Sequence, residues 1–313
     1  MLKIGIDLGG TNIAAGIVNE SGEILFKSSV PTVASRPKEE IIDDIALLCK
    51  NLCVESGTDF NSIESVGIAV PGGVDEKKGV IILTPNIPFS GLPICDILSE
   101  KLDGKRVTLA NDANAATLAE VLAGAAKGAE NAVMITLGTG VGGGIVIDKK
   151  IYSGSNGLAG EIGHFVIQMG GEKCGCGRRG CFEAYASATA LIRMTKDEIN
   201  KCFMSGEATL MAEGSRITAR TAFDAFKQGD AAAARVIETY TDALANGIIS
   251  MINIFQPDVF IIGGGVSGEK QFLIDLLQPK IDAEEFARNS EKRTRICTAT
   301  CGNDAGIIGA ALS

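Results

Sequence analysis

The single histidine of the chain stands a short distance before three of its cysteines. His164 ends the run EIGH, and Cys174, Cys176 and Cys181 follow as C-x-C-x₄-C in a glycine-rich stretch. One imidazole and three thiolates form a closed tetrahedral ligand set that suits structural zinc. Because the protein supplies all four ligands, such a metal has no open position at which to activate water. The sequence therefore predicts a structural zinc site at these four residues.

The alternative for this cluster is a redox-active or unpaired group of cysteines in a loop. The chain begins MLKIGIDLGG, which enters a strand directly and has no apolar region of a signal peptide. No apolar run approaches the roughly 20 residues of a membrane-spanning helix. We therefore expect a cytoplasmic protein whose thiols stay reduced, and this compartment favours a metal site over a redox-active cluster.

Three glycine-rich turns follow apolar strands: DLGGTN, LGTGVGGG and IIGGG. Glycine permits positive φ and a close approach to the backbone, and the threonine of the first two turns adds a hydroxyl. These two match neither the P-loop nor the Rossmann fingerprint, because a strand follows where those motifs have a helix. We expect hairpin N–H groups there to hold phosphates, and the third turn to help bind a nucleoside. The candidate nucleotide-binding residues are Gly9, Gly10, Thr11, Asn12, Gly138, Thr139, Gly140, Gly263, Gly264 and Gly265.

The strand RVTLAND ends in a carboxylate that is suited to general-base catalysis. Asp112 lies where a strand gives way to a helix, and such a junction can point a short acidic side chain toward a substrate. Phosphoryl transfer to an alcohol needs a base that accepts the hydroxyl proton. The competing role for Asp112 is to cap the alanine-rich helix that follows, and both roles use the same oxygens. If Asn111 caps the helix, the carboxylate is available for catalysis.

Strands and helices alternate around these motifs, which predicts α/β layering. The chain has 313 residues, enough for two domains, since single cores usually stop growing near ~250 to 300 residues. Its net charge of −9 repels nucleic acid and anionic lipid, so we expect neither as a partner. The expected elements are antiparallel strands at 2–8, 13–19 and 23–30, a helix at 37–56, strands at 65–70 and 106–112, a helix at 231–254, and a last strand and helix within 295–312.

The opening of the chain recurs near its middle. Aligning Leu8 with Leu137 matches IDLGGTNIAAGIVN to ITLGTGVGGGIVID. A repeated strand-turn-strand unit at a domain-sized spacing suggests two lobes of similar fold, each presenting a glycine turn to a shared cleft. The alternative is chance similarity between two glycine hairpins.

Nine motifs resemble, in order, those of the ROK family (repressors, open reading frames and kinases), and most of all its bacterial glucokinase branch. They are GIDLGGT, GIAVPGGVD, TPNIP, NDANAA, LGTGVGGG, GEIGH, CGCGRRGCFEAYAS, IIGGG and GNDAGIIGAA. The resemblance implies an α/β fold of the two-lobed actin/hexokinase type, a duplicated ribonuclease H-like fold with a cleft between the lobes. It implies a smaller amino-terminal lobe at 1–111, completed by the carboxy-terminal helix at about 302–313, and a larger lobe at 112–301 that carries the zinc site.

The same resemblance implies an ATP-dependent kinase that phosphorylates a hexose, most of all glucose to glucose 6-phosphate. Asp112 matches the family's catalytic base. Asp7 would lie near Mg²⁺, through water, because Mg²⁺ keeps much of its hydration. Zinc bound to one ring nitrogen of His164 would orient the ring and leave the other nitrogen for the sugar. The residues that match the family's sugar pocket are Gly73, Asn86, Asn111, Asp112, Glu161, His164 and Glu183. The alternative for Glu161 and Glu183 is that they are ordinary surface carboxylates, because Glu is mostly exposed.

Two departures leave alternatives open. Many glucokinases of the family have a tryptophan soon after NIP, whereas this chain reads NIPFSG and contains no tryptophan. N-acetylmannosamine, N-acetylglucosamine and fructose kinases of the family therefore remain candidates. The family also includes sugar-responsive repressors with a winged helix-turn-helix before the kinase-like body; because DLGGT already begins at Asp7, a non-catalytic regulator is the less favoured reading. The resemblance further implies a homodimer or higher homo-oligomer.

Overall fold

The computed structural model describes residues 1–84 and 86–313, which form two compact units. Unit 1 comprises Met1–Ala132, Gly144–Gly160 and Thr300–Ser313, and unit 2 comprises Val133–Gly143 and Glu161–Ala299. Among the described residues, no helix combines the length and the apolar character that a membrane crossing requires.

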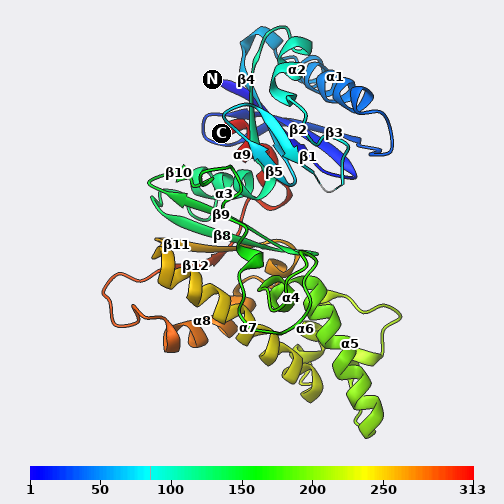
Figure 1. Ribbon diagram of the computed structural model, residues 1–313, viewed down its shortest axis with the longest axis vertical. Helices are drawn as coiled ribbons and strands as arrows, with labels where there is room; N and C mark the ends of the chain where they lie inside the picture. The colour runs from blue at the N-terminus through cyan, green and yellow to red at the C-terminus, as the bar shows by residue number, and fades with distance from the viewer. Residues whose placement is uncertain (85) are drawn as a thin grey trace. The chain divides into compact units, whose positions relative to one another are not determined.

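The first sheet has five strands in the order β3-β2-β1-β4-β7 (Figure 1). β1 (Leu2–Leu8), β2 (Asn12–Asn19) and β3 (Ile24–Pro31) pair as antiparallel neighbours. β4 (Ile63–Val70) pairs parallel to β1, and β7 (Arg106–Asn111) pairs parallel to β4. The expected strands of this region are confirmed. Because three parallel strands end at one edge, the residues that follow each of them meet there.

Helices cover both faces of this sheet. α1 (Lys38–Ser56) and α2 (Ile94–Lys101) bury their apolar residues with those of β1, β2 and β4 in one core, which confirms the expected helix at 37–56. α9 (Ala305–Leu312) lies against the opposite face (Figure 1). Its backbone comes so close to the sheet that a Cβ at Gly67 would lie 1.7 Å from the carbonyl oxygen of Ala310. Only glycine allows this approach.

Helix α3 (Asp112–Leu122) belongs to unit 1 because it packs on α9. A Cβ at Gly309 would lie 1.8 Å from the carbonyl oxygen of Ala115, so the two helices touch backbone to backbone. The boundary expected after residue 111 would assign α3 to the larger lobe. In the structure, the contacts of α3 group it with unit 1 instead. The two-stranded hairpin of β5 (Gly73–Asp75) and β6 (Val80–Leu83) also lies in unit 1.

The second sheet repeats the topology of the first, in the order β10-β9-β8-β11-β12. β9 and β10 are antiparallel, as β2 and β3 are, and β11 and β12 are parallel, as β4 and β7 are. The duplication expected from the glycine hairpins is therefore a duplication of a whole sheet. The strands are β8 (Ala132–Leu137), β9 (Val141–Ile147), β10 (Lys150–Ile151), β11 (Val259–Gly263) and β12 (Arg295–Thr298).

Unit 2 is rich in helices: α4 (Glu183–Ala186), α5 (Ala188–Ser205), α6 (Ala219–Lys227), α7 (Ala231–Phe255) and α8 (Gln271–Glu284). The long helix expected at 231–254 is confirmed as α7. Short 3₁₀ turns complete the chain at Phe60–Ser62 (η1), Ile162–His164 (η2), Leu210–Ala212 (η3), Gly265–Glu269 (η4) and Gly302–Asp304 (η5).

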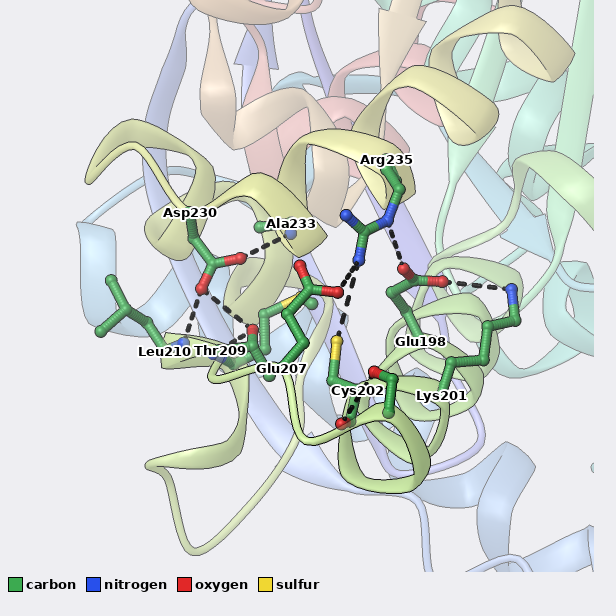
Figure 2. A network of polar contacts seen from close by, with 11 residues as sticks. Glu198, Lys201, Cys202, Glu207, Thr209, Leu210, Asp230, Ala233 and Arg235 are labelled. Atoms are coloured by element: carbon green, nitrogen blue, oxygen red, sulfur yellow. Dashed lines mark hydrogen bonds and ion pairs between the residues drawn. The ribbon is translucent and has the colours of Figure 1, made fainter.

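A polar network joins α5 to α7 in unit 2 (Figure 2). Arg235 of α7 donates to Glu198 of α5 at 2.6 Å and to Glu207 at 2.8 Å. These two carboxylates raise the pKa of the Arg235 guanidinium. At the start of α7, the carboxylate of Asp230 accepts the N–H of Ala233 at 2.8 Å and caps the helix. The network fixes α5, whose first residues lie beside the second glycine turn.

Candidate active site and metal centre

The four predicted zinc ligands lie together in unit 2. Sγ of Cys174 is 3.6 Å from Nδ1 of His164, Sγ of Cys176 is 3.7 Å from Sγ of Cys181, and all four donor atoms lie within 4.8 Å of one another. A zinc ion with Zn–S near ~2.3 Å and Zn–N near ~2.0 Å separates its tetrahedral ligand atoms by about 3.5 to 3.8 Å. The donor set and these two distances therefore fit zinc.

Glycines fold the metal-binding loop back on itself. Gly177 has φ of 90°, and its N–H donates to the carbonyl oxygen of Cys174 at 3.0 Å, which turns the chain between the ligands. A Cβ at Gly180 would lie 1.7 Å from the carbonyl oxygen of Gln168, so the returning chain packs on its own backbone. The backbone of Cys181 then pairs with that of Val166 in an isolated antiparallel β-bridge. Burial raises the pKa of the Cys174 thiol, so metal binding must displace its proton.

The ring of His164 offers its two nitrogens to different neighbours. Nδ1 faces Cys174, and Nε2 lies 4.0 Å from Oε2 of Glu161, whose side chain is largely exposed. A metal held through Nδ1 would leave Nε2 and the Glu161 carboxylate side by side, each able to meet a hydroxyl group.

Glu183 links the metal cluster to the second glycine turn, residues 138–141. Its Oε2 accepts the N–H of Val141 at 3.0 Å, and its Oε1 lies 3.4 Å from Sγ of Cys174. A Cβ at Gly140 would lie 2.3 Å from Oε2, so only glycine fits beside this carboxylate. The carboxylate predicted to bind sugar thus also holds the turn.

The start of α5 supports the second glycine turn. The N–H of Ala188 donates to the carbonyl oxygen of Gly138 at 2.9 Å, and the hydroxyl of Thr189 donates to that of Thr139 at 2.7 Å. The third glycine turn, residues 263–265, lies beside it. Gly264 has φ of 80°, and a Cβ there would lie 2.5 Å from the backbone nitrogen of Leu137, the last residue of β8.

A cavity of about 230 Å³ in unit 2 connects the second glycine turn with the metal loop. Thr139, Cys174, Glu183 and Arg193 are among its lining residues. A predicted metal ligand, a predicted sugar ligand and a predicted phosphate-binding residue therefore line the same cavity.

In unit 1, two carboxylates interact at the carboxyl edge of the first sheet. Asp7 precedes the last residue of β1, and Asp112 begins α3 directly after β7. Burial raises the pKa of Asp7 to about 6, and the negative charge of Asp112 adds to this rise. A buried carboxyl with a raised pKa beside a second carboxylate is typical of a functional site.

Asn111 caps helix α3. Its Oδ1 accepts the N–H groups of Ala113 at 2.9 Å and Asn114 at 3.1 Å, while its Nδ2 donates to the carbonyl oxygen of Gly72 at 2.9 Å. The competing capping role considered for Asp112 therefore belongs to Asn111, although Oδ1 of Asp112 also accepts the N–H of Ala113 at 2.8 Å. One side chain thus fixes both the helix and the loop that precedes Gly73.

The first glycine turn, residues 9–12, is held by Thr32. The buried hydroxyl of Thr32 donates to the carbonyl oxygen of Gly9 at 2.6 Å, and its N–H donates to that of Thr11 at 2.8 Å. Within the turn, the N–H of Gly9 donates to the carbonyl oxygen of Asn12 at 2.9 Å. Gly10 and Thr11 are exposed.

The remaining predicted sugar-pocket residues of unit 1 lie on loops near this edge. A Cβ at Gly10 would lie 3.4 Å from Cβ of Asn86, which places Asn86 beside the first glycine turn. Gly73 begins β5, and a Cβ there would lie 2.5 Å from Cδ2 of Leu158. Asn86 is exposed, whereas Gly73 is buried and can offer only its backbone.

Three supporting residues were not predicted from the sequence: Thr32, Thr189 and Glu120. The carboxylate of Glu120 is fully buried and accepts the N–H groups of Ala125, Thr300 and Cys301 at 2.7 to 2.8 Å. It thereby anchors the segment that leads to α9. A single acidic residue within the apolar run ATLAEVLAG was the available signal for Glu120, while neither threonine is marked by any local pattern.

Comparisons with known proteins find similar chains over nearly the full length of this one. The family model described as "ROK family" matches residues 3–312. The glucokinase of Thermotoga maritima is 37% identical over 309 residues, which cover 98% of this chain and 95% of that protein.

Solved structures agree as well. The ROK hexokinase of Thermus thermophilus matches with a TM-score of 0.82 at 34% identity, covering 100% of this chain and 97% of that one. A ROK family glucokinase from Streptomyces griseus, solved in complex with glucose and AMPPNP, matches with a TM-score of 0.79 at 35% identity, covering 99% and 98%. With a family model that spans almost every residue and relatives that match over nearly their full length, the chain belongs to the ROK family.

Proposed function

We propose that this chain is an ATP-dependent sugar kinase that phosphorylates glucose to glucose 6-phosphate. The observation that carries the proposal is the pair of interacting carboxylates, Asp7 and Asp112, at the carboxyl edge of the first sheet. Family membership and the 37% identity to a glucokinase support the same activity.

In this proposal Asp112 is the catalytic base and accepts the proton of the sugar hydroxyl as that oxygen attacks the γ-phosphorus of ATP. Capping of α3 by Asn111 supports the assignment, because Oδ1 of Asn111 accepts the N–H groups of both Ala113 and Asn114. The N–H groups of the first and second glycine turns hold the phosphates, and the third turn contributes to the nucleoside site. Mg²⁺, carried with ATP, would neutralise phosphate charge, and Asp7 is the carboxylate we assign to its water ligands.

Sugar recognition is assigned to Glu161, His164 and Glu183 from unit 2 and to Asn86, Asn111 and the backbone of Gly73 from unit 1. Carboxylates and amides accept or donate hydrogen bonds to hydroxyls, and an analogue that lacks a hydroxyl leaves them unpaired. The spacing of the cysteines and His164 supports zinc as a structural ion that orients this recognition. A cytoplasmic location and a homo-oligomeric state remain predictions within this proposal.

The test is a coupled assay of ADP release with purified protein, ATP and Mg²⁺ over glucose, fructose, N-acetylglucosamine and N-acetylmannosamine. We expect the highest kcat/KM with glucose. A higher value with one of the other sugars would reassign the substrate within the family. Binding of a sugar without ADP release from any of the panel would refute the kinase and support a non-catalytic regulator.

A further inference from the structure

Near the end of α3, Glu120 carries a fully buried carboxylate that the proposed reaction does not use. Its Oε1 accepts the N–H groups of Thr300 at 2.8 Å and Cys301 at 2.7 Å. Its Oε2 accepts the N–H of Ala125 at 2.7 Å and the hydroxyl of Thr300 at 3.1 Å. Burying a charge is costly unless hydrogen bonds compensate it, so donors that converge from two segments hold this carboxylate in one place.

The loop after α3 is shaped to admit this carboxylate. A Cβ at Gly124 would lie 2.1 Å from Oε2 of Glu120 and 2.7 Å from Sγ of Cys301. Only glycine leaves room for both groups at this distance. The carboxylate therefore joins α3 closely to residues 300–301, the segment that leads into α9.

The helix that carries Glu120 also carries the proposed base. α3 begins at Asp112 and packs on α9 through the close contact between Ala115 and Gly309. A helix moves as a rigid rod, so its two attachments, at Ala115 and at Glu120, set the direction in which it presents Asp112. Loss of one attachment lets the helix turn about the other.

The segment that Glu120 binds leads to the second carboxylate of the pair. From Cys301 the chain passes through η5 into α9, whose second residue is Gly306. A Cβ at Gly306 would lie 2.6 Å from Oδ2 of Asp7. A Cβ at Gly5 would lie 1.9 Å from the carbonyl oxygen of Ile307, so the same turn of α9 packs on β1, the strand that carries Asp7. The position of this segment thus decides what surrounds the Asp7 carboxylate.

We propose that Glu120 is a positioning residue that fixes the separation of Asp7 and Asp112. It acts through α3 on one side and through residues 300–306 on the other, and we assign it no contact with sugar or nucleotide. All of these residues lie in unit 1. The inference rests on the proposed function, in which Asp112 accepts the proton of the sugar hydroxyl.

The first test is Glu120→Gln, which keeps the size of the side chain. A carboxylate accepts at both oxygens, whereas an amide has one accepting oxygen and turns its NH₂ group toward the remaining donors. We expect kcat for ADP release to fall about 10- to 100-fold, because a small displacement of a catalytic group is costly. The KM for the sugar should change less than kcat.

A double-mutant cycle separates positioning from a merely structural role. If Glu120 acts through Asp112, the protein with both Asp112→Asn and Glu120→Gln should have the kcat of Asp112→Asn alone, within about twofold. With the base already removed, its position no longer matters. Two effects that multiply would show that Glu120 acts elsewhere and would overturn the proposal.

A second readout needs no kinase activity. Burial and the charge of Asp112 raise the pKa of Asp7 to about 6, and carbon-13 NMR titrates this carboxyl group in the ligand-free protein. Both causes depend on the packing that Glu120 maintains, so Glu120→Gln should lower the pKa of Asp7 toward its ordinary value of 3.8. An unchanged pKa overturns the proposal. If the unsubstituted protein releases no ADP, the proposed function fails, and this titration still decides the role of Glu120.

The matched control is Glu285→Gln in unit 2. Glu285 is 1% exposed and pairs with Arg293, so the substitution also removes a buried carboxylate. Its kcat and the pKa of Asp7 should equal those of the unsubstituted protein. Thermal unfolding of both variants reports whether each is folded at the assay temperature.

Gly124→Ala tests the proposal if Glu120→Gln does not fold. This variant keeps the carboxylate of Glu120, but the added Cβ displaces it. The backbone of Gly124 does not have a positive φ, so alanine can adopt its conformation. We expect the same decreases in kcat and in the pKa of Asp7, at smaller size. Folded Gly124→Ala with both quantities unchanged would overturn the proposal.

Discussion

The first and second glycine turns hold equivalent places in two sheets of the same topology, but different side chains support them. The first turn is held by one buried threonine, Thr32, whose hydroxyl and N–H both donate to its carbonyl oxygens. The second is held by two successive residues at the start of α5, one of which is the exposed Thr189. Both turns thus receive a donor at the carbonyl oxygen of their first glycine, Gly9 or Gly138, whereas the second supported carbonyl and the source of the donors differ.

The surroundings of the two turns differ more than their supports. Beside the first turn lie the carboxylates Asp7 and Asp112, whose charges interact. Beside the second lies Glu183, which joins the turn to the metal cluster through Cys174. The difference teaches that one copy of the motif lies beside the acidic groups to which we assign the chemistry, whereas the other is joined to the predicted metal site. Four predictions test this division.

The largest effect is expected from the carboxylates beside the first glycine turn. Asp112→Asn removes the proposed base and keeps the size of the side chain, so kcat should fall by about 10² to 10⁴ while the sugar KM changes little. Steady-state assays of ADP release give both constants. Asp148→Asn, an exposed aspartate in the turn between β9 and β10, is the matched control and should behave as the unsubstituted protein. Full activity of Asp112→Asn would remove the base from the mechanism.

The metal side is tested by Cys181→Ser, which removes a predicted zinc ligand without touching a predicted sugar ligand. We expect loss of bound zinc, measured by elemental analysis, and a drop in sugar affinity of about 10- to 100-fold, because His164 and Glu183 lose their fixed positions. Cys95→Ser, outside the cluster, should retain the metal. Zinc content unchanged in Cys181→Ser would contradict the proposed ligand set.

The pH dependence of stability should come from Asp7. Its pKa rises from 3.8 to about 6 on folding, so the native state binds its proton more tightly than the unfolded state does. The contribution of Asp7 to stability is therefore most favourable at low pH and decreases as pH rises from about 4 through about 6. Asp7→Asn removes this cost and should stabilise the nucleotide-free protein by about 1 to 3 kcal/mol at pH 8, with the gain vanishing below pH ~4.

Thermal and urea unfolding at pH 8 and pH 4 measure the effect of Asp7→Asn, with Asp148→Asn again as the control. A gain of equal size at both pH values would mean that the ionisation of Asp7 is not its cause.

The smallest effect is expected on stability, when the hydroxyl group of Thr32 or of Thr189 is removed. Thr32→Val removes the hydroxyl that donates to the carbonyl oxygen of Gly9 and should cost about 1 to 3 kcal/mol. Thr189→Val removes an exposed hydrogen bond that water can replace, so we expect about 0.5 kcal/mol. Urea unfolding of the two variants in parallel makes each the control of the other. Equal losses would show that the two turns are supported alike.

The features that depend on neighbouring residues were predicted from the sequence. The glycine turns, the α1 and α7 helices and the strand-to-helix junction at Asp112 follow from local backbone sterics and from the period of apolar residues. The metal cluster was also predictable, because four ligands of the right type lie within one short segment and a glycine-rich loop can bring them together.

Other features were decided only by the tertiary structure, because they depend on residues far apart in the chain. Thr32 and Thr189 support turns that precede them by many residues, and Glu120 binds the backbone of Thr300 and Cys301 from the other end of the sequence. The grouping of α3 with α9 likewise rests on the close approach of Gly309 to Ala115. A hydrogen bond or a packing contact forms wherever folding brings two groups together, and no local pattern records that distance. The sequence determined which groups could do chemistry, and the fold decided which of them meet.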